Sequence, residues 1–407
     1  MRIKPFRAWR PAPEVAALVA APPYDVLDSE EARALVRDNP LSFLHVSKAE
    51  IDLPPGTDVH DPRVYAEARK NLRCFQREEV LVQEAEPVLY LYRLIREGHT
   101  QTGLVTVCHT EDYARNIIRK HERTLKAKED DRMRHITTLN ANTGPVFLAY
   151  RPQPALDTLA QRVQAGQALY DFTAPDGVQH TVWRVPEAAV WVAAFAGVPL
   201  AYIADGHHRA AAAARVAQER RAAQTPSTGQ EEYLWFLAVL FPSSQLRILP
   251  YNRCVQALQG SAPAAFLKRI RQAGFTVTDN AAPAPEAPRH ISLYLDGRWH
   301  GLSWPADPRA DAVGGLDVSV LQDRILEPLL GIDDPRKNPR LDFVGGIRGT
   351  DELRQRGDAG RATAAFSMYP TSMDQLLAIA DAGQIMPPKS TWFEPKLKSG
   401  LFLHDLE

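Results

Sequence analysis

Cysteine is scarce in this chain of 407 residues, which contains Cys74, Cys108 and Cys254 and no others. The three are widely spaced, and no two of them form the C-x-x-C pair that structural zinc sites and redox motifs use. This spacing excludes a disulfide framework and a structural zinc site. We therefore expect a protein of the reducing cytoplasm.

Long apolar runs and a strong charge of either sign are also missing. No stretch approaches the roughly 18 uninterrupted apolar residues of a membrane-spanning helix, so we expect no membrane partner. The first residues lack the apolar core of a secretory signal. The formal net charge is −1, so we do not expect nucleic acid as a partner.

The signature motifs of several enzyme classes are absent. The chain has no G-x-x-x-x-G-K-[ST] P-loop, no protein-kinase signature set, no G-x-S-x-G elbow and no G-x-G-x-x-G after a predicted strand. These absences argue against the usual P-loop and protein-kinase sites, an α/β-hydrolase and a Rossmann dinucleotide site.

The order of apolar and polar segments predicts a mixed α/β (α+β) fold. Helices are expected from Asp28 to before Pro40, from Asp61 to Glu79, and within the charged segment 112–140. A surface loop is expected at 225–229. Strands are expected at 3–9, 41–46, 88–95, 100–109, 146–150, 180–185, 233–241, 291–295, 298–303 and 341–344. This mixture does not fit a simple doubly wound sheet.

The length suggests two or three domains. We expect an N-terminal α/β region at residues 1–150, a core region at 151–280 and a C-terminal α/β region at 281–407. The segment 279–288 is rich in Ala and Pro and is the expected linker. The sequence leaves the oligomeric state open.

The segment 201–214 is the most informative part of the chain. An apolar strand meets Asp205 and a single glycine, and an alanine-rich helix follows. The start of a helix presents unpaired backbone N–H groups and the positive end of the helix dipole, and so attracts anions, phosphate above all. Arg209 can add a bidentate clamp. The residues assigned to this phosphate cradle are Gly206, His207, His208 and Arg209.

Asp205 can alternatively be a simple helix cap, with Gly206 easing the turn. Three cationic or donor side chains at one helix start repel one another unless an anion compensates, which favours the phosphate interpretation. Asp205 would itself repel phosphate, so we expect helix capping or a contact through a metal ion for this residue.

Two clusters nearer the N-terminus are candidates for catalysis. Two prolines stiffen the loop 21–26 and can hold Tyr24 and Asp25 in fixed directions, although a solvated turn is an equal alternative. In the charged run 120–132, His121-Glu122 suggests a zinc helix, but the residue four positions after His121 is a leucine, so that interpretation fails. The run is then either a solvated helix face or a site in which Glu122 is a general base and the lysines and arginines contact phosphate.

Two later clusters are weaker candidates for an anion site. The glycine-rich segment 345–349 can cradle a phosphate or simply make a turn. The segment 386–400 holds aromatic residues, prolines and lysines in a compact stretch. Lys389 and Lys396 are available there for an anion, or the segment is a proline-locked tail that covers a sheet edge.

Together these motifs resemble the family named domain of unknown function 1015. The matching segments, in chain order, are 4–8, 21–26, 121–122, 205–209, 251–253 and 386–396. The resemblance extends over essentially the whole chain. It identifies a family but implies little about activity.

The Asp-Gly-His-His-Arg loop also resembles the nucleotide- and phosphate-binding loop of the ParB/sulfiredoxin superfamily, which includes free-serine kinases. That resemblance implies a ParB/sulfiredoxin-like core within a larger mixed-sheet protein, with ATP or ADP and Mg²⁺ held through the phosphates. No ParB-like helix-turn-helix is apparent. The sulfiredoxin-type cysteine is missing, since His207 follows Gly206, so reduction of oxidised cysteine is not expected.

The resulting hypothesis is an ATP-dependent phosphotransferase acting on a small hydroxyl metabolite. The serine-kinase resemblance implies L-serine as acceptor and O-phosphoserine as product. Phosphoryl transfer needs donors and cations around the γ-phosphate and a carboxylate that orients the hydroxyl. A phosphatase or nucleotide hydrolase of the same fold and a nucleotide-responsive binding protein without turnover are the alternatives. The residues expected in catalysis are Glu122 or, failing that, Asp25, together with Asp205, and those expected at the nucleotide are Gly206, His207, His208, Arg209, His121, Lys389 and Lys396.

Overall fold

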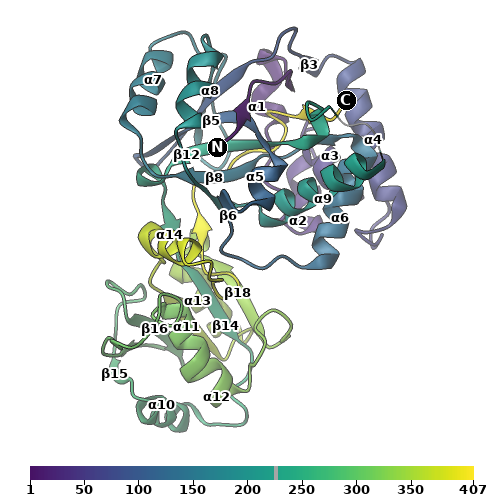
Figure 1. Ribbon diagram of the computed structural model, residues 1–407. Helices are drawn as coiled ribbons and strands as arrows, with labels where there is room; N and C mark the ends of the chain where they lie inside the picture. Colours follow the sequence, from purple (N-terminus) through teal and green to yellow (C-terminus); the bar gives the residue numbers. More distant parts are fainter. Residues whose placement is uncertain (224–227) are drawn as a thin grey trace. The chain divides into compact units, whose positions relative to one another are not determined.

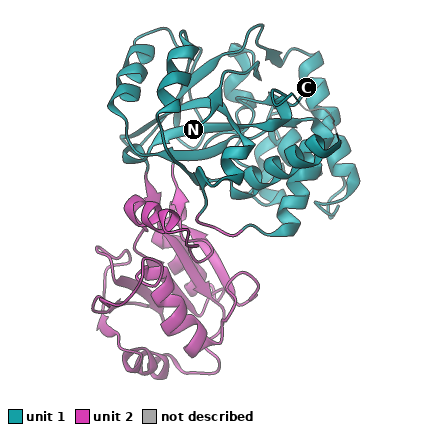
Figure 2. Ribbon diagram, in the orientation of Figure 1, with its two compact units in different colours: residues 1–120, 124–246, 395–407 teal, residues 121–123, 247–394 magenta. Residues whose placement is uncertain are grey.

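The chain divides into two compact units in the computed structural model, which describes residues 1–223 and 228–407. Unit 1 contains residues 1–120, 124–246 and 395–407, and unit 2 contains residues 121–123 and 247–394 (Figure 2). The borders expected at 150 and 280 fall inside these units. The expected linker 279–288 also lies within unit 2. Of the loop expected at 225–229, residues 225–227 lie outside the described residues.

Unit 1 is built on a nine-stranded mixed sheet (Figure 1). The strand order is β6-β11-β8-β12-β5-β4-β10-β9, with β1 paired to β5. The pairs β11–β6 and β12–β8 are parallel, and the other pairs are antiparallel. The strands are β1 (Ile3–Lys4), β4 (Leu89–Arg96), β5 (His99–His109), β6 (Ile118–Arg119), β8 (Val146–Tyr150), β9 (Tyr170–Thr173), β10 (Gln179–Val185), β11 (Ala201–Asp205) and β12 (Trp235–Pro242). A mixed α/β fold is thereby confirmed.

Apolar sequence explains the centre of this sheet. Every residue of β12 is buried, and the strand lies between β8 and β5. A continuous apolar run of this kind is typical of a strand covered on both faces. The β4–β5 hairpin turns at Glu97 and Gly98, as expected, because both residues adopt the positive φ that its two-residue turn requires.

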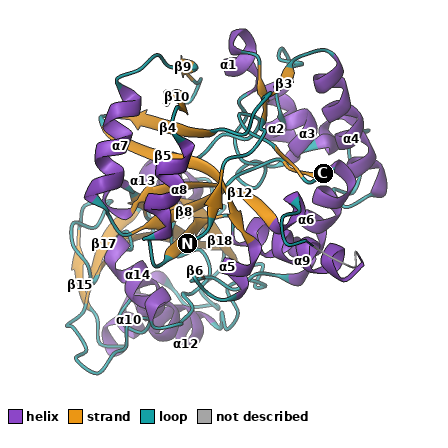
Figure 3. Ribbon diagram, turned by 45° about the horizontal axis from the view of Figure 1, so that its top comes forward, coloured by secondary structure: helices purple, strands orange, loops and turns teal. Residues whose placement is uncertain are grey.

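Helices cover both ends of the unit 1 sheet. The views in Figures 1 and 3 agree that α7 and α8 lie side by side at one end and that α4, α6 and α9 gather at the other. Asp28 forms a capping box with Glu31, and Asp61 caps the next helix, as expected. The helices are α1 (Ala16–Val19), α2 (Ser29–Val36), α3 (Leu44–Ser47), α4 (Pro62–Arg77), α5 (Thr110–Ala114), α6 (Lys126–Leu139), α7 (Pro154–Gln164), α8 (Ala188–Ala196) and α9 (His207–Ala223).

Three of the expected elements are wrong. The strand expected at 41–46 is instead the short helix α3. A short apolar run shows no hydrophobic periodicity that would distinguish a buried strand from a buried helical turn. The helical segment expected at 112–140 is broken into α5, β6, an extended stretch and α6. The strand expected at 3–9 is split into β1 and β2 (Trp9–Pro11), which pairs with β3 (Leu81–Gln83).

Unit 2 contains a six-stranded antiparallel sheet in the order β15-β17-β16-β19-β14-β18. Its strands are β14 (Tyr251–Val255), β15 (Thr276–Asp279), β16 (His290–Leu295), β17 (Arg298–Ser303), β18 (Leu341–Gly345) and β19 (Ala364–Met368), and a separate pair joins β13 (Ile248–Leu249) to β20 (Trp392–Phe393). Its helices are α10 (Pro263–Gln272), α11 (Asp317–Leu321), α12 (Glu327–Leu330), α13 (Gly349–Asp358) and α14 (Met373–Asp381). Among the described residues, no helix combines the length and apolarity needed to cross a membrane.

The C-terminal residues 395–407 return to unit 1. The strand β21 (His404–Asp405) pairs with β7 (Ala141–Asn142), and isolated bridges join Leu403 to Trp9 and Ser399 to Ala21. Leu403 is buried in a core cluster with residues of α2, α3 and α4. These contacts fix the segment that carries Lys396 onto unit 1.

Candidate functional site

The site forms where β11 passes into α9. The register of β11 against β8 shifts between Ile203 and Asp205, and Gly206 then adopts a φ of +92°. The bulge and the left-handed glycine turn the chain from strand to helix within one residue. Alanines at 210–213 and 217 are buried, so the small side chains allow α9 to pack closely. The helix start is therefore held against the sheet.

Asp205 is held between two cations. Arg209 Nη2 donates to Asp205 Oδ2 at 2.9 Å, and Lys396 Nζ donates to Oδ1 at 3.3 Å. Arg209 Nη1 also donates to the Pro145 carbonyl. The side chains of Asp205, Arg209 and Lys396 are 28%, 13% and 15% exposed. Two segments that are distant in sequence, 205–209 and the one that carries Lys396, thus meet at one carboxylate.

This arrangement determines the ionisation of Asp205. Burial alone would raise the pKa of the carboxyl group, but the charges of Lys396 and Arg209 and the hydrogen bond from Lys396 outweigh burial and hold the pKa well below its usual range. Asp205 is therefore an anion at neutral pH. It pairs with both Arg209 and Lys396, the two cations that the sequence assigned to phosphate.

Gly206 is required for a second reason besides its φ. A Cβ at this position would lie 3.1 Å from both Cζ and Nε of Arg209. The guanidinium group therefore packs directly over the glycine backbone. Any side chain here would press on the Arg209 guanidinium, which would have to shift by a few tenths of an ångström.

The two histidines at the start of α9 have different surroundings. His207 is 5% exposed, and burial lowers its pKa to about 3 although the charge of Asp205 acts in the opposite direction. His207 is therefore neutral at physiological pH. His208 Nε2 accepts a hydrogen bond of 3.1 Å from the backbone N–H of Leu125, which immediately precedes α6. His208 thus fixes the start of α9 relative to α6.

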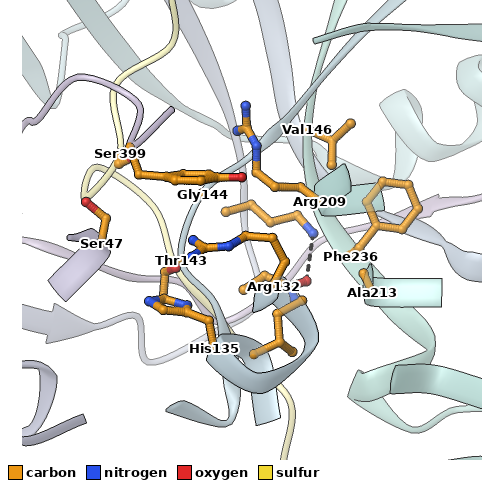
Figure 4. Close-up of a pocket in the computed structure, with 14 residues that line it drawn as sticks. Ser47, Arg132, His135, Thr143, Gly144, Val146, Arg209, Ala213, Phe236 and Ser399 are labelled. Carbon is orange, nitrogen blue, oxygen red and sulfur yellow. Dashed lines mark hydrogen bonds between the residues drawn. The ribbon is translucent and has the colours of Figure 1, made fainter. Parts of the chain in front are cut away.

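A small pocket of about 40 Å³, lined by both apolar and polar side chains, lies beside Arg209 (Figure 4). Arg132 from α6 stacks over the Tyr24 ring at 4.0 Å and bonds to Asp131 at 2.6 Å. Burial raises the pKa of Tyr24 to about 12, with the charge of Arg132 opposing it. The pocket-lining residues used below are Tyr24, Ser47, Arg132, His135, Gly144 and Arg209.

Of the candidate catalytic bases, Asp25 is in unit 1 and Glu122 is in unit 2. Asp25 is exposed. The residue before it, Tyr24, lines the pocket together with Arg209. Glu122 is half-buried in the three-residue segment 121–123.

The other predicted contacts belong to unit 2. The His121 carbonyl accepts from the N–H of Met386 at 2.8 Å, and Lys389 Nζ lies 5.4 Å from the centre of the Tyr251 ring. In the glycine-rich segment, a Cβ at Gly345 would lie 2.5 Å from Trp392, so that glycine permits close packing. The structure thus brings together Asp205, Gly206, His207, His208, Arg209 and Lys396. The roles assigned to these residues, and those of Asp25, His121, Glu122 and Lys389, stay predictions.

No group of three or more His, Cys, Asp or Glu side chains within residues 1–223 and 228–407 is arranged to hold a metal ion. Asp205 is a single carboxylate with both oxygens already bonded. These residues do not form a preformed metal site. Any Mg²⁺ at the site would have to be held chiefly by the phosphates of a nucleotide.

The sequence predicts for Arg132 only the phosphate-contact role that it shares with the other lysines and arginines of the charged run, and it predicts no role for the Pro145 carbonyl. Arg132 was one cation among many in a charged run. Its position next to the buried stripe Met133, Ile136 and Leu139 of α6 is the signal that distinguishes it from its solvated neighbours. The Pro145 carbonyl had no such signal, because backbone acceptors are not encoded by residue type.

Comparisons with known proteins place the chain in a family. The model of the family described as "Protein of unknown function (DUF1015)" matches residues 3–319. No curated protein matches the chain. Similar solved structures include a free serine kinase in complex with AMP, at 12% sequence identity and a TM-score of 0.39, with 74% of this chain and 91% of that chain covered. A conserved hypothetical protein from Pyrococcus furiosus is similar at 11% identity and a TM-score of 0.37, with 73% of this chain and 94% of that chain covered. C-terminally truncated SbnI from Staphylococcus aureus is similar at 11% identity and a TM-score of 0.39, with 74% of this chain and 87% of that chain covered. These likenesses are too distant to carry a functional inference, whereas the family model matches most of the sequence, and the chain therefore belongs to the DUF1015 family.

Proposed function

We propose that the protein is a nucleotide-dependent phosphotransferase whose phosphate site is the start of α9. The observation that carries this proposal is the cluster of Asp205, Arg209 and Lys396 at the first turn of a helix that directly follows a strand. A helix start supplies N–H groups and a positive dipole to an anion. Arg209 and Lys396 supply two charges beside it. Phosphoryl transfer depends mainly on positioning and charge stabilisation of this kind.

In the proposed reaction, the hydroxyl oxygen of the acceptor forms a bond to the γ-phosphorus of ATP. The bond from that phosphorus to the oxygen bridging it to the β-phosphate breaks, and ADP leaves with the electron pair. The hydroxyl proton passes to a carboxylate, for which Glu122 is proposed and Asp25 is the alternative. L-serine is the first acceptor to test, as the loop resemblance implies.

Phosphate binding at this site requires a change of partners. Arg209 and Lys396 are bonded to Asp205, so a nucleotide phosphate must compete with that carboxylate for both cations. When Mg²⁺ accompanies the nucleotide, it neutralises phosphate charge, and Asp205 is the carboxylate of this cluster that can contact it. The required exchange of ion pairs also favours a second candidate, a nucleotide-responsive binding protein without turnover.

The test is a reaction of pure protein with ATP, Mg²⁺ and single hydroxyl compounds, beginning with L-serine. The proposal predicts that ADP and one phosphorylated product form in equal amounts and that Lys396→Met, which keeps the length of the side chain but not its charge, slows the reaction. Phosphate release without an acceptor would instead identify a hydrolase. Stabilisation by nucleotide without product would identify the binding protein. No response to any nucleotide by folded protein overturns the proposal.

A further inference from the structure

The pocket beside Arg209 is lined by two largely buried arginine side chains. It lies within unit 1, and the side chains of Arg132 and Arg209, each 13% exposed, both line it (Figure 4). Arg132 reaches it from α6 and Arg209 from the first turn of α9. Its volume of about 40 Å³ corresponds to about three water positions. A group the size of a carboxylate fits this space.

Two buried polar atoms at the pocket have unmet hydrogen-bonding capacity. Arg209 Nε and Ser47 Oγ are both inaccessible to solvent and have no hydrogen-bond partner among the described residues. Polar atoms buried in this way are uncommon in folded proteins, because leaving them unpaired is unfavourable. Both belong to residues that line the same pocket. These two lining residues therefore have hydrogen-bonding capacity that is unused in this structure.

The two arginines at the pocket are each bonded to an aspartate, Arg132 to Asp131 and Arg209 to Asp205. His135 adds no positive charge, because burial lowers the pKa of its imidazole to about 4. A carboxylate bound here would share the guanidinium groups with these aspartates.

His135 presents an acceptor to the same pocket. Its Nε2 lies 3.2 Å from the Val46 carbonyl, which can only accept, so Nε2 carries the proton and Nδ1 has the lone pair. Nδ1 can accept from an ammonium or hydroxyl group next to a bound carboxylate. The pocket thus offers donors to an anion and an acceptor to a neighbouring donor.

We propose that this pocket binds the carboxylate of a small hydroxy acid or hydroxy amino acid. The planar guanidinium groups of Arg132 and Arg209 match the planar carboxylate. That the bound acid is the phospho-acceptor rests on the proposed function, since Arg209 joins the pocket to the start of α9. The binding of the carboxylate itself does not rest on it.

The binding test compares pairs of small molecules by calorimetry in the absence of nucleotide. Glycolate and L-serine carry a carboxylate. Ethylene glycol has a hydroxymethyl group in place of the carboxylate of glycolate, and ethanolamine has a hydrogen in place of that of L-serine. Inorganic phosphate is the other oxyanion. We expect glycolate or L-serine to bind and the compounds without a carboxylate not to bind. Equal binding of glycolate and ethylene glycol, or binding of phosphate alone, overturns the proposal.

A matched pair of variants on α6 tests the role of Arg132. Arg132→Gln removes the buried charge and is expected to weaken carboxylate binding at least tenfold. Arg134→Gln changes an exposed arginine of the same helix and should stay within twofold of the unsubstituted protein. If Arg132→Gln does not fold, Ser47→Ala removes the unpaired hydroxyl and is expected to weaken binding severalfold. Unchanged affinity in the folded variant overturns the assignment.

Transfer assays separate this inference from the proposed function. If no phosphoryl transfer occurs but glycolate or L-serine binds in an Arg132-dependent way, the phosphotransferase proposal fails and the carboxylate pocket stands. If ethanolamine is phosphorylated as efficiently as L-serine, the phosphotransferase stands and the carboxylate pocket fails.

Discussion

Asp205 ends β11 and Arg209 lies four residues later in the first turn of α9, and their side chains are joined by a hydrogen bond of 2.9 Å. The bond spans the junction between β11 and α9, and Gly206 lies directly beneath the guanidinium group. Lys396, from a segment 191 residues away, bonds the other oxygen of the carboxylate. The ion pair therefore fixes the geometry of the proposed phosphate site.

Arg209→Ala is expected to weaken nucleotide binding by about 2 kcal/mol or more, the scale of a lost charge-assisted pair. This corresponds to a roughly 30-fold increase in Kd. Arg209→Lys keeps the positive charge but lacks the paired N–H donors of the guanidinium group, so it should retain part of the affinity for nucleotide. Calorimetric titration with ATP measures both. Unchanged Kd in Arg209→Ala would remove this residue from the site.

Glu122→Gln tests the assignment of the base. If Glu122 accepts the proton, the variant should bind nucleotide normally and lose at least about 100-fold in kcat, the lower range for general-base catalysis. Asp25→Asn is the matched alternative on the loop that borders the pocket, and it should then have the smaller effect on kcat. A comparable loss of nucleotide affinity in Glu122→Gln and Arg209→Ala contradicts the separate roles of these residues.

Stability is expected to fall in mild acid because of buried neutral histidines. Burial lowers the pKa of His135 to about 4 and that of His207 to about 3, whereas both have the ordinary value of about 6.5 in the unfolded chain. Below pH 6.5 the unfolded state therefore binds more protons than the folded state. The stabilisation is fully present above pH 6.5 and is lost as pH falls toward 4 and then 3.

Urea unfolding at pH 7, 6 and 5 measures this loss. Each histidine contributes a slope of up to about 1.4 kcal/mol per pH unit. His207→Gln should reduce the slope relative to the unsubstituted protein. A free energy of unfolding that is constant from pH 7 to 5, or a slope unaffected by the variant, would contradict the neutral buried state of His207.

Asp205 affects the stability of the folded protein at lower pH than the histidines do. Its pKa is lowered in the folded state, so the ion pairs with Arg209 and Lys396 stabilise the protein fully above the ordinary carboxyl pKa of about 4. This contribution is lost only as pH falls below that value toward the lowered pKa. Asp205→Asn should therefore lower the free energy of unfolding at pH 7 and make it less dependent on pH below pH 4. A variant as stable as the parent at pH 7 would argue against a stabilising role of these ion pairs.

Gly206→Ala and Gly98→Ala form a matched pair. Both glycines have positive φ, +92° and +78°, but an alanine at Gly98 meets nothing within 4 Å, whereas at Gly206 its Cβ meets the Arg209 guanidinium at 3.1 Å. Gly98→Ala should cost about 1 kcal/mol from backbone strain alone. Gly206→Ala should cost more, on the order of 2 kcal/mol, and should also weaken nucleotide binding. Equal losses of stability by thermal unfolding would show that the Arg209 contact is unimportant.

The local part of the site could be predicted from the sequence. A strand, an acid, a single glycine and an alanine-rich helix occur in one continuous segment, and each residue type has a local cause in turn or helix geometry. The cap at Asp61 was predictable for the same reason, because a capping residue acts on N–H groups two or three positions away.

The long-range part could not be predicted in the same way. The contact of Lys396 with Asp205 depends on a C-terminal segment that leaves unit 2 and pairs with β7 of unit 1, and such pairing has no local sequence signal. The sequence indicated an anion near Lys396, but not that Asp205 is that anion. The neutral state of His207 likewise results from tertiary burial, which the pattern of a helix start does not reveal.

The most direct test of the central claim is a crystal structure of the protein grown with a non-hydrolysable ATP analogue and Mg²⁺. The account predicts phosphate oxygens within hydrogen-bond distance of the backbone N–H groups at the start of α9, with Arg209 or Lys396 turned from Asp205 to the phosphates. A nucleotide bound elsewhere, with the Asp205 ion pairs intact and the start of α9 without an anion, would contradict it.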